Sequence, residues 1–447
     1  MSFPAYESYK ESGVEWLGRI PFHWKTTALK RFCALITDGA HVSPITENGM
    51  YCFVSTVNVS INGIDFENCL KTSEENYRYL VKAGCKPEIG DVLFSKDGTI
   101  GRTVVVSEAV DFVVASSLII IRPDQHRLDC SYLNHLCQSE FVQQQVARFV
   151  KGAGLPRLSI QNLVRVIGIF PSMGEQRTIA IFLDREVAKI DALVEGQRRL
   201  IELLKEKRQA VISHAVTKGL DPSAPMKDSG VEWLGEVPAH WEVCFLKRAF
   251  SEVDYGISDS LDADDGVAVL RMGNIQDGEI DLTDLKYVTS VEEALLLRPL
   301  DLLFNRTNSL DQIGKVGLLR QPPSCPLSFA SYLVRLRLNP SCSPQFMSKL
   351  LNTRDVLGQA RARAFVAIGQ CNLNPTRYGE ITVALPPIAE QEQIATYLEG
   401  EAHEIDALVS TARTAITLLQ ERRAALISAA VTGKIDVRGL VQTAEAA

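Results

Sequence analysis

The sequence predicts a mixed α+β protein made of one unit repeated twice, each unit a strand-rich globular domain followed by a long helix. A motif in residues 12–24, Ser-Gly-Val-Glu-Trp-Leu-Gly followed by Pro and His-Trp, returns in residues 229–241. A helical motif in residues 175–193 returns in residues 390–408, at nearly the same offset. Repeats at one spacing decide an architecture before other sequence signals do. We therefore expect two globular domains separated by two long antiparallel coiled-coil helices, as a pseudo-twofold internal repeat.

Length and composition fit two such units. The 447 residues exceed one ordinary domain, and 46% are hydrophobic and 23% charged, as in soluble globular proteins. The formal net charge of −7 argues against a chain that is basic throughout, although a basic patch can be local. Without a signal segment or a long apolar run, we expect no membrane partner and a cytoplasmic location.

The first globular domain is predicted to occupy residues 1–170. Short β-branched runs, such as residues 104–106 and 118–121, predict strands, and the Asp97-Gly98 pair predicts a turn. Apolar spacing predicts one helix in residues 129–150.

A helical spacer is predicted in residues 171–222. Pro171 precedes the helix, and Gly219 and Pro222 close it, as helix-stop signals do. Residues at spacings of three and four form one largely apolar stripe, namely Ile190, Leu193, Val194, Gln197, Leu200, Ile201, Leu204, Val211 and Ile212. The charged residues opposite this stripe are most simply a solvated face.

The second half repeats this plan, with a globular domain in residues 223–385, a helical spacer in residues 386–437 and a tail in residues 438–447. Its stripe recurs 215 residues later, at Ile405, Leu408, Val409, Ile416, Leu419, Leu426 and Ile427. The two stripes match in phase, so packing them against each other is the simplest way to bury both. The globular domains match less well, although Asn58 aligns with Asn274. Divergent domains on a shared frame suggest two heads with different targets.

The repeat also closes on itself. Val-Thr at residues 216–217 leads into the second copy of the tryptophan motif, and Val-Thr at residues 431–432 would lead into the first copy if the chain were circular. We therefore expect the two termini to lie near each other.

The repeated motifs resemble the specificity subunit of type I restriction-modification systems, from about residue 9 to residue 437. The residues that carry this resemblance are the two tryptophan motifs and the two helical motifs, which in the first copy are Glu175-Gln176, Ile190-Asp191-Ala192-Leu193, Leu203-Leu204 and Arg208. The resemblance implies two target-recognition domains that each read half of a bipartite double-stranded DNA site. It also implies helices that set the spacing and dock methyltransferase subunits, and through them restriction subunits.

The resemblance further implies a subunit without catalytic activity. S-adenosylmethionine, ATP and magnesium are then expected on the partner subunits, and no cofactor in this chain. The sequence agrees, because it contains no GxxxxGK[ST] phosphate loop, HExxH motif or CxxC pair among its ten cysteines. We predict no catalytic and no metal site. Two alternatives stay open: a coiled-coil adaptor without DNA reading, and a free-standing DNA-modifying enzyme.

Residues that read DNA should differ between the two halves. Lysine and arginine donate to guanine, asparagine pairs with adenine, and basic side chains also contact phosphates. The candidates lie in matching polar loops and before the last strand of each domain: Ser95, Lys96, Thr99, Arg102, Arg157, Asn305, Arg306, Thr307, Asn308, Lys315, Arg361 and Arg363. A polar turn with solvated charges is the alternative for these loops.

Residues common to both halves should instead build the frame. The candidates for packing between the helices or against a partner are Ile190, Leu193, Leu200, Leu204, Val211, Ile405, Leu408, Ile416, Leu419 and Leu426. The tryptophans of both motifs could stack on bases, but residues kept in both copies cannot explain two different half-site readings. We expect them to pack, and His23 and His240 to pack or form hydrogen bonds.

Overall fold

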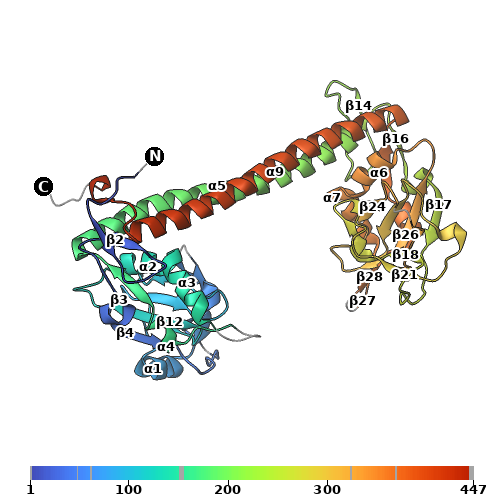
Figure 1. Cartoon of the computed structure of the whole chain (residues 1–447). Helices are drawn as coiled ribbons and strands as arrows, with labels where there is room; N and C mark the ends of the chain where they lie inside the picture. Colours follow the sequence, from blue (N-terminus) through green and yellow to red (C-terminus); the bar gives the residue numbers. More distant parts are fainter. Residues whose placement is uncertain are drawn as a thin grey trace. The chain divides into compact units, whose positions relative to one another are not determined.

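A computed structural model of the chain is shown in Figure 1. The residues it describes are 3–47, 49–60, 63–150, 156–322, 325–367 and 370–441. By internal contacts the chain divides into unit 1, Met1–Arg198 with Arg413–Ala447, and unit 2, Arg199–Ala412. Each unit contains one globular domain and parts of both long helices.

The globular domain of unit 1 has a four-stranded antiparallel sheet in the order β10–β9–β12–β4. Its strands are β4 (Cys33–Asp38), β9 (Val92–Ser95), β10 (Thr103–Val105) and β12 (Leu118–Pro123). A second sheet, in the order β11–β5–β8, contains β5 (Tyr51–Val54), β8 (Leu70–Thr72) and β11 (Phe112–Val114). The β-branched runs predicted as strands are thus the buried centre of this domain.

Three strand pairs complete unit 1. They are β1 (Tyr9–Glu11) with β2 (Arg19–Pro21), β3 (Lys25–Ala28) with β13 (Ile167–Phe170), and β6 (Val59–Ser60) with β7 (Gly63–Ile64). The short helices are η1 (Leu29–Phe32), η2 (Thr56–Asn58), α1 (Glu74–Lys82), α2 (Cys130–Gln138), α3 (Glu140–Phe149), α4 (Ile160–Leu163) and η6 (Arg438–Leu440).

The single helix predicted for residues 129–150 is wrong in one respect. The segment forms two helices, α2 and α3, that meet at Ser139. Ser139 has extended backbone angles, and its side chain accepts a hydrogen bond from the Val142 N–H, so it is the N-cap of α3. Apolar periodicity continues across the break, which is why it did not reveal the cap.

Unit 2 repeats the sheet of unit 1 with the same strand order. β17 (Phe250–Tyr255), β26 (Leu333–Leu338), β22 (Leu302–Asn305) and β24 (Val316–Leu318) correspond to β4, β12, β9 and β10, and the sheet continues into β20 (Glu279–Ile280) and β19 (Ile275–Gln276). The smaller sheet contains β21 (Lys286–Val288), β18 (Val267–Leu270) and β25 (Leu327–Phe329). Strand pairs are β14 (Met226–Asp228) with β15 (Glu236–Pro238), and β16 (Glu242–Phe245) with β29 (Thr382–Leu385).

The helices of unit 2 also follow the repeat, with two differences. They are η3 (Leu246–Ala249), η4 (Met272–Asn274), η5 (Glu293–Leu295), α6 (Pro344–Leu351), α7 (Arg354–Arg363) and α8 (Pro375–Gly379). The short η5 stands where unit 1 has α1. A second difference concerns strands. Unit 2 has a three-stranded sheet in the order β23 (Thr307–Asn308), β28 (Gln370–Asn372) and β27 (Phe365–Ala367), which the described residues of unit 1 do not form.

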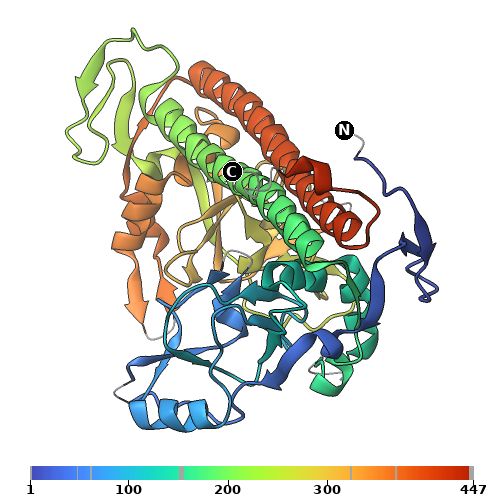
Figure 2. The ribbon, with the colours of Figure 1, turned by 90° about the vertical axis from the view of Figure 1, so that its left-hand side faces the viewer.

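The two long helices are α5 (Met173–Lys218) and α9 (Ile388–Val431). In unit 1 the first part of α5 lies beside the last part of α9 (Figures 1 and 2), and Arg423 pairs with Asp191 at 3.0 Å. In unit 2 the last part of α5 pairs with the first part of α9 through Arg208 and Asp406 at 2.9 Å. The two ion pairs are related by the repeat offset of 215 residues, so the predicted antiparallel, pseudo-twofold helix pair is confirmed.

Each globular core includes the start of one long helix and the end of the other. In unit 1, Ile179 of α5 and Val431 of α9 belong to the core that contains Trp24. In unit 2, Val216 of α5 and Ile394 of α9 join Trp241. The terminal segments meet in unit 1, where the Asp436 N–H donates to the Pro4 carbonyl at 2.7 Å, so the expected proximity of the termini is confirmed (Figure 1).

Candidate nucleic-acid interface

A histidine of each globular domain contacts a glutamate of the long helix that follows it, and this contact recurs in both units. His23 Nε2 lies 2.9 Å from Glu175 Oε2 in unit 1, and His240 Nε2 lies 2.7 Å from Glu390 Oε2 in unit 2. Each glutamate lies in the first turn of its long helix, where the helix dipole favours an anion. The tryptophan motif and the helical motif therefore meet in space, which explains why both recur together.

The glutamine after each glutamate connects the long helix to the domain's own helices. Gln176 Oε1 accepts from the N–H of Asp129, the N-cap of α2, and Gln176 Nε2 donates to the Arg127 and Pro171 carbonyls. Gln391 does the same with the N–H of Ser343, the N-cap of α6, and with the Ser341 and Pro386 carbonyls. Both amides are buried, and their hydrogen bonds satisfy backbone groups that would otherwise lack partners.

Trp24 and Trp241 are buried, as the packing prediction requires, and they do not serve as stacking platforms. Each packs against a glycine that follows the end of a long helix and has a left-handed φ. A Cβ on Gly433 would lie 3.1 Å from Trp24, and one on Gly219 would lie 3.4 Å from Trp241. Positive φ and close approach both favour glycine here.

The two copies differ in the hydrogen bonding of the buried tryptophan. Trp241 Nε1 donates to Glu390 Oε1 at 3.1 Å. In unit 1, the equivalent Trp24 Nε1 and Glu175 Oε1 are buried and have no hydrogen-bond partner among the described residues. The contacts between domain and helix thus have the same arrangement in both units, but the buried tryptophan nitrogen and glutamate oxygen are hydrogen-bonded only in unit 2.

The loop after β9 contains the candidate DNA contacts of unit 1. Ser95 is buried and donates to the Asp97 carbonyl, and Lys96 is buried in an ion pair with Asp38, the last residue of β4. Thr99 is exposed, while half-buried Arg102 donates to the Val59 carbonyl. Arg157 is exposed and pairs with Asp97 at 3.1 Å.

The Asp38 carboxylate contacts both Lys96 and His41. Burial raises the pKa of the Asp38 carboxyl, but hydrogen bonds and charge attraction from Lys96 and His41 outweigh this and leave the pKa below its ordinary value. The ion pair therefore keeps Lys96 turned inward at neutral pH.

The loop after β22 is the equivalent region of unit 2. Asn305, in the position of Ser95, is buried, and neither of its amide atoms has a partner among the described residues. Arg306, in the position of Lys96, lies 5.0 Å from the ring centre of Tyr255, which replaces Asp38 at the end of β17. The cation is kept, but its neighbour changes from a carboxylate to an aromatic ring.

The rest of this loop is also rebuilt. Thr307 is buried and its Oγ1 accepts from Asn372 Nδ2 at 3.1 Å, where unit 1 has the Asp97–Arg157 ion pair. Asn308 is half-buried and accepts from the Ser309 N–H, and Lys315 is half-buried.

Two further arginines lie at the end of α7. Arg361 donates to the Asp311 carbonyl, and Arg363 donates to Gln359 on its own helix. Both are half-buried.

The structure counts against four of the twelve candidates. Ser95, Lys96, Asn305 and Thr307 are buried, so none can reach a base edge or phosphate without a change in its surroundings. The sequence did not reveal this, because polar side chains that follow a strand can turn inward onto distant partners. DNA contact by the other eight stays a prediction.

Sequence reasoning missed three residues of this region. Asp38, Tyr255 and Asn372 complete the two versions of the loop, although they lie 58, 51 and 65 residues from their partners Lys96, Arg306 and Thr307. The signal for Asp38 and Tyr255 was positional, since they end the matching strands β4 and β17, whereas Asn372 ends β28, which has no equivalent strand among the described residues of unit 1.

The predicted helix-packing residues divide by exposure. Ile190, Leu204 and Ile405 are buried, and Val211, Ile416, Leu419 and Leu426 are half-buried, at heptad positions. Leu193, Leu200 and Leu408 are exposed, each one residue before a seam position. These three do not pack within the helix pair, because one residue turns a side chain by about 100° on a helix with about 3.6 residues per turn.

Two kinds of feature are absent from the described part of the chain. No cluster of three or more His, Cys, Asp or Glu side chains there could hold a metal ion. None of its helices combines the length and apolarity needed to cross a bilayer.

Comparisons with known proteins agree with this architecture. The sequence model of the family described as the type I restriction modification DNA specificity domain matches residues 21–203. The EcoKI specificity subunit of Escherichia coli is 22% identical over 422 residues, covering 86% of this chain and 89% of that protein. A putative MjaX specificity subunit of Methanocaldococcus jannaschii is 28% identical over 195 residues, 42% of this chain and 45% of that protein.

Solved structures show the same fold. The HsdS subunit from Thermoanaerobacter tengcongensis superposes with a TM-score of 0.53 at 15% identity, covering 93% of this chain and 98% of that one. A chain from a structural study of assembly and conformational transition in a type I system gives a TM-score of 0.64 at 17% identity, covering 93% and 99%. The family match in residues 21–203 and the long relatives thus make the chain similar to type I restriction-modification DNA specificity subunits over most of its length.

Proposed function

We propose that each globular domain reads one half of a bipartite double-stranded DNA site, and that the chain performs no catalysis itself. The observation that carries this is the contrast between a repeated frame and a rebuilt loop. The His23–Glu175 contact, the hydrogen bonds of Gln176 and their equivalents recur in both units, whereas the loops after β9 and β22 contain different polar groups. Different groups on one scaffold are what reading two half-sites requires.

We also propose that the helix pair docks methyltransferase subunits and, through them, restriction subunits. Leu203 of α5 is 45% exposed and Leu418 of α9 is 59% exposed, although Leu203 precedes buried Leu204 and Leu418 precedes half-buried Leu419 on the helix seam. Helices from a partner would cover these leucines in a four-helix arrangement. The methyl donor S-adenosylmethionine, and ATP and magnesium, then belong to the partner subunits.

The acidic balance of the chain fits assisted DNA binding. With a net charge of −7, the isolated subunit repels the DNA backbone at long range. Partner subunits would complete the basic channel. Tight, specific DNA binding by the isolated chain at physiological salt would contradict this part of the proposal.

The decisive experiment is methylation mapping of DNA from cells that co-express this chain with its methyltransferase subunit. We expect methylated adenines in one split motif with a fixed gap. Exchange of residues 223–385 for the equivalent domain of a relative should alter only one half of that motif. A contiguous motif would contradict the two-domain reading, and a stable complex without methylation would favour the adaptor.

Adjacent leucines of α5 provide a matched test of docking. Leu204 is buried, so Leu204→Asp should cost about 3 kcal/mol or more in the free energy of unfolding. Ile190→Asp should behave in the same way, with loss of partner binding as well. Leu203→Asp should leave stability unchanged and weaken capture of the methyltransferase subunit. Full capture by a folded Leu203→Asp variant would contradict docking at this face.

A further inference from the structure

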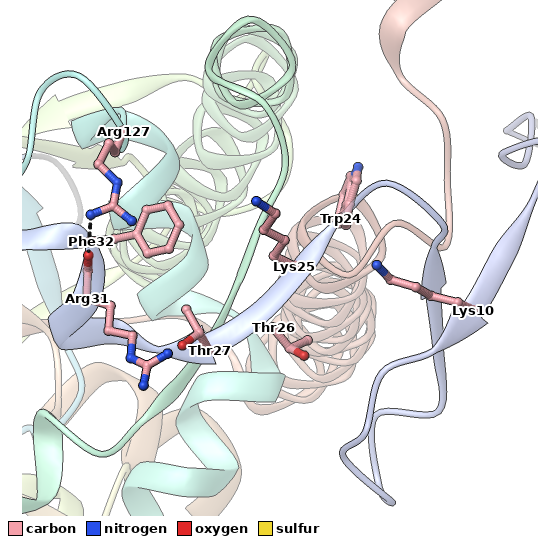
Figure 3. A pocket seen from close by; sticks show the side chains of 8 residues that line it. All are labelled: Lys10, Trp24, Lys25, Thr26, Thr27, Arg31, Phe32 and Arg127. Carbon is pink, nitrogen blue, oxygen red and sulfur yellow. Dashed lines mark hydrogen bonds between the residues drawn. The ribbon is translucent and has the colours of Figure 1, made fainter.

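A basic cavity lies in unit 1 away from the candidate reading loop. It has a volume of about 450 Å³ and is lined by Lys10, Lys25, Arg31 and Arg127, together with Trp24, Thr26, Thr27 and Phe32. Figure 3 shows Arg31 and Arg127 on either side of Phe32, while Lys25 comes from β3 and Lys10 from β1. No carboxylate lines the cavity.

The four cations have no carboxylate partners among the described residues. The guanidinium of Arg127 lies 4.5 Å from the ring centre of Phe32, which stacks on Phe170 at 3.8 Å, and it donates to the Arg31 carbonyl. The Lys10 ammonium lies 5.6 Å from the ring centre of Phe22. These contacts position the side chains and leave their charges uncompensated, in a chain whose net charge is −7.

The fold does not need four unpaired charges here, because unit 2 keeps only two of the cations, Lys227 and Arg248, and pairs Arg248 with a carboxylate. Glu242 stands in the position of Lys25 and pairs with Arg248, the equivalent of Arg31, at 2.9 Å. Ser341 occupies the position of Arg127, as their matching hydrogen bonds to Gln391 and Gln176 show. Four unpaired cations in unit 1 thus correspond to one internal ion pair and Lys227, which donates to the Trp241 carbonyl.

This asymmetry identifies the class of ligand. A protein partner that docks on both copies of a repeated frame should find the same groups twice, as in the His23–Glu175 and His240–Glu390 pairs. The cavity instead differs between units, like the reading loops. DNA meets each domain separately and has no such requirement, and its phosphates are the natural partners of lysine and arginine.

The position of the cavity fits a duplex that also reaches the loop after β9. Strand β4 connects the two regions. Arg31 and Phe32 of the cavity lie directly before its first residue, and its last residue, Asp38, pairs with Lys96 of the loop after β9. Six residues of strand span about 17 Å, or roughly five base pairs at about 3.4 Å each. We propose that this cavity binds backbone phosphates of the DNA beside the first half-site, an inference that rests on the proposed function.

The test compares salt dependence of DNA binding by the complex of this chain with its methyltransferase subunit. Lys25→Gln with Arg31→Gln should lower the slope of log affinity against log salt by about 1.8, because each lost phosphate contact removes about 0.9. At about 0.15 M salt the affinity should fall roughly 10- to 30-fold, equally for specific and nonspecific duplexes. The methylated motif should not change.

The matched control removes the cation of unit 2 that is equivalent to Arg31. Arg248→Gln should leave the slope unchanged, because Arg248 is already paired with Glu242. An unchanged slope in the Lys25/Arg31 variant would overturn the proposal. So would loss of methyltransferase capture at full DNA affinity, which would assign the cavity to an acidic protein segment. Saturable ATP binding that this variant loses would assign it to a free nucleotide.

Failure of the proposed function would look different. In that case the wild-type complex itself would show no preference for a bipartite site, whatever the variants do. If the wild-type complex methylates a clear bipartite motif and the salt slope of the Lys25/Arg31 variant is unchanged, only the proposal of a phosphate-binding cavity is contradicted.

Discussion

Unit 1 and unit 2 make the same contacts where the globular domain meets its long helix, and different contacts in the loop after the central strand. The histidine–glutamate contact and the glutamine hydrogen bonds of the repeated motifs recur in both units, and the tryptophan is buried in both, although only Trp241 donates a hydrogen bond to its glutamate. The lysine–aspartate and arginine–aspartate pairs of unit 1 become an arginine–tyrosine contact and a threonine–asparagine hydrogen bond in unit 2. The same arrangement of strands thus accommodates different polar groups in the loop after the central strand, while the contacts between domain and helix are largely the same.

The same comparison separates structural from recognition charges. Arg122 pairs with buried Asp91, and Arg337 pairs with buried Asp301, so these repeated ion pairs belong to the fold. Of the cavity cations of unit 1, Lys25 and Arg127 have no cationic equivalent in unit 2, and the equivalent of Arg31 is paired with Glu242, so the unpaired charges of unit 1 do not belong to the fold. A charge that appears in one copy only is the better candidate for a ligand contact.

The largest effect should come from the buried tryptophans. Trp24→Ala and Trp241→Ala should each cost about 3–5 kcal/mol in the free energy of unfolding, because each empties a core position. The phenylalanine variants sharpen the comparison. Trp241→Phe should cost about 1–3 kcal/mol more than Trp24→Phe, since only Trp241 donates to a glutamate. Chemical denaturation of the four variants checks this, and equal costs for the two phenylalanine variants would contradict it.

Two glycines should respond alike in both units. A Cβ on Gly39 would lie 2.2 Å from the Ala115 carbonyl oxygen, and one on Gly256 would lie 2.2 Å from that of Phe329. Each alanine variant should therefore cost about 1–3 kcal/mol or more, from overpacking against backbone. Gly174→Ala, which meets nothing within 4 Å, is the control and should be neutral or slightly stabilising. Thermal unfolding measures all three, and a neutral Gly256→Ala would break the equivalence.

The loop pairs should control one half-site each. Arg157→Ala should weaken recognition of the first half-site, and Asn372→Ala that of the second, by about 1–3 kcal/mol, or roughly 5- to 150-fold. Methylation rates on duplexes with substitutions in either half-site distinguish the two. The other half-site in each duplex is the internal control. A uniform loss across sequences would instead indicate phosphate contacts.

The smallest effect concerns pH and exists only in unit 1. The folded-state pKa of Asp38 is lowered, so its ion pair contributes stability above the unfolded-state pKa and loses it as pH falls through the folded-state value. Asp38→Asn should therefore be less stable than wild type at pH 7, and the difference should shrink below about pH 4. Denaturation at several pH values measures it. Tyr255→Phe in unit 2 should show no comparable pH dependence.

The frame could be predicted from the sequence because its information is local and given twice. The repeated motifs fixed the number of domains, and the three-and-four spacing fixed the two long helices and their antiparallel pairing. Asn58 and Asn274 were aligned from sequence, and both accept hydrogen bonds from a backbone N–H three residues earlier. Residues that agree in type and spacing in two copies are constrained by the same contacts.

Only the tertiary structure decided which loop side chains face outward. Lys96 and Asn305 look like DNA contacts in the sequence, yet both are buried, because Asp38 and the strands around Asn305 come from distant parts of the chain. The break at Ser139 and the exposed leucines one position off the helix seam were hidden for a related reason. Periodicity records which residues are apolar, whereas burial and pairing depend on what the rest of the chain places beside them.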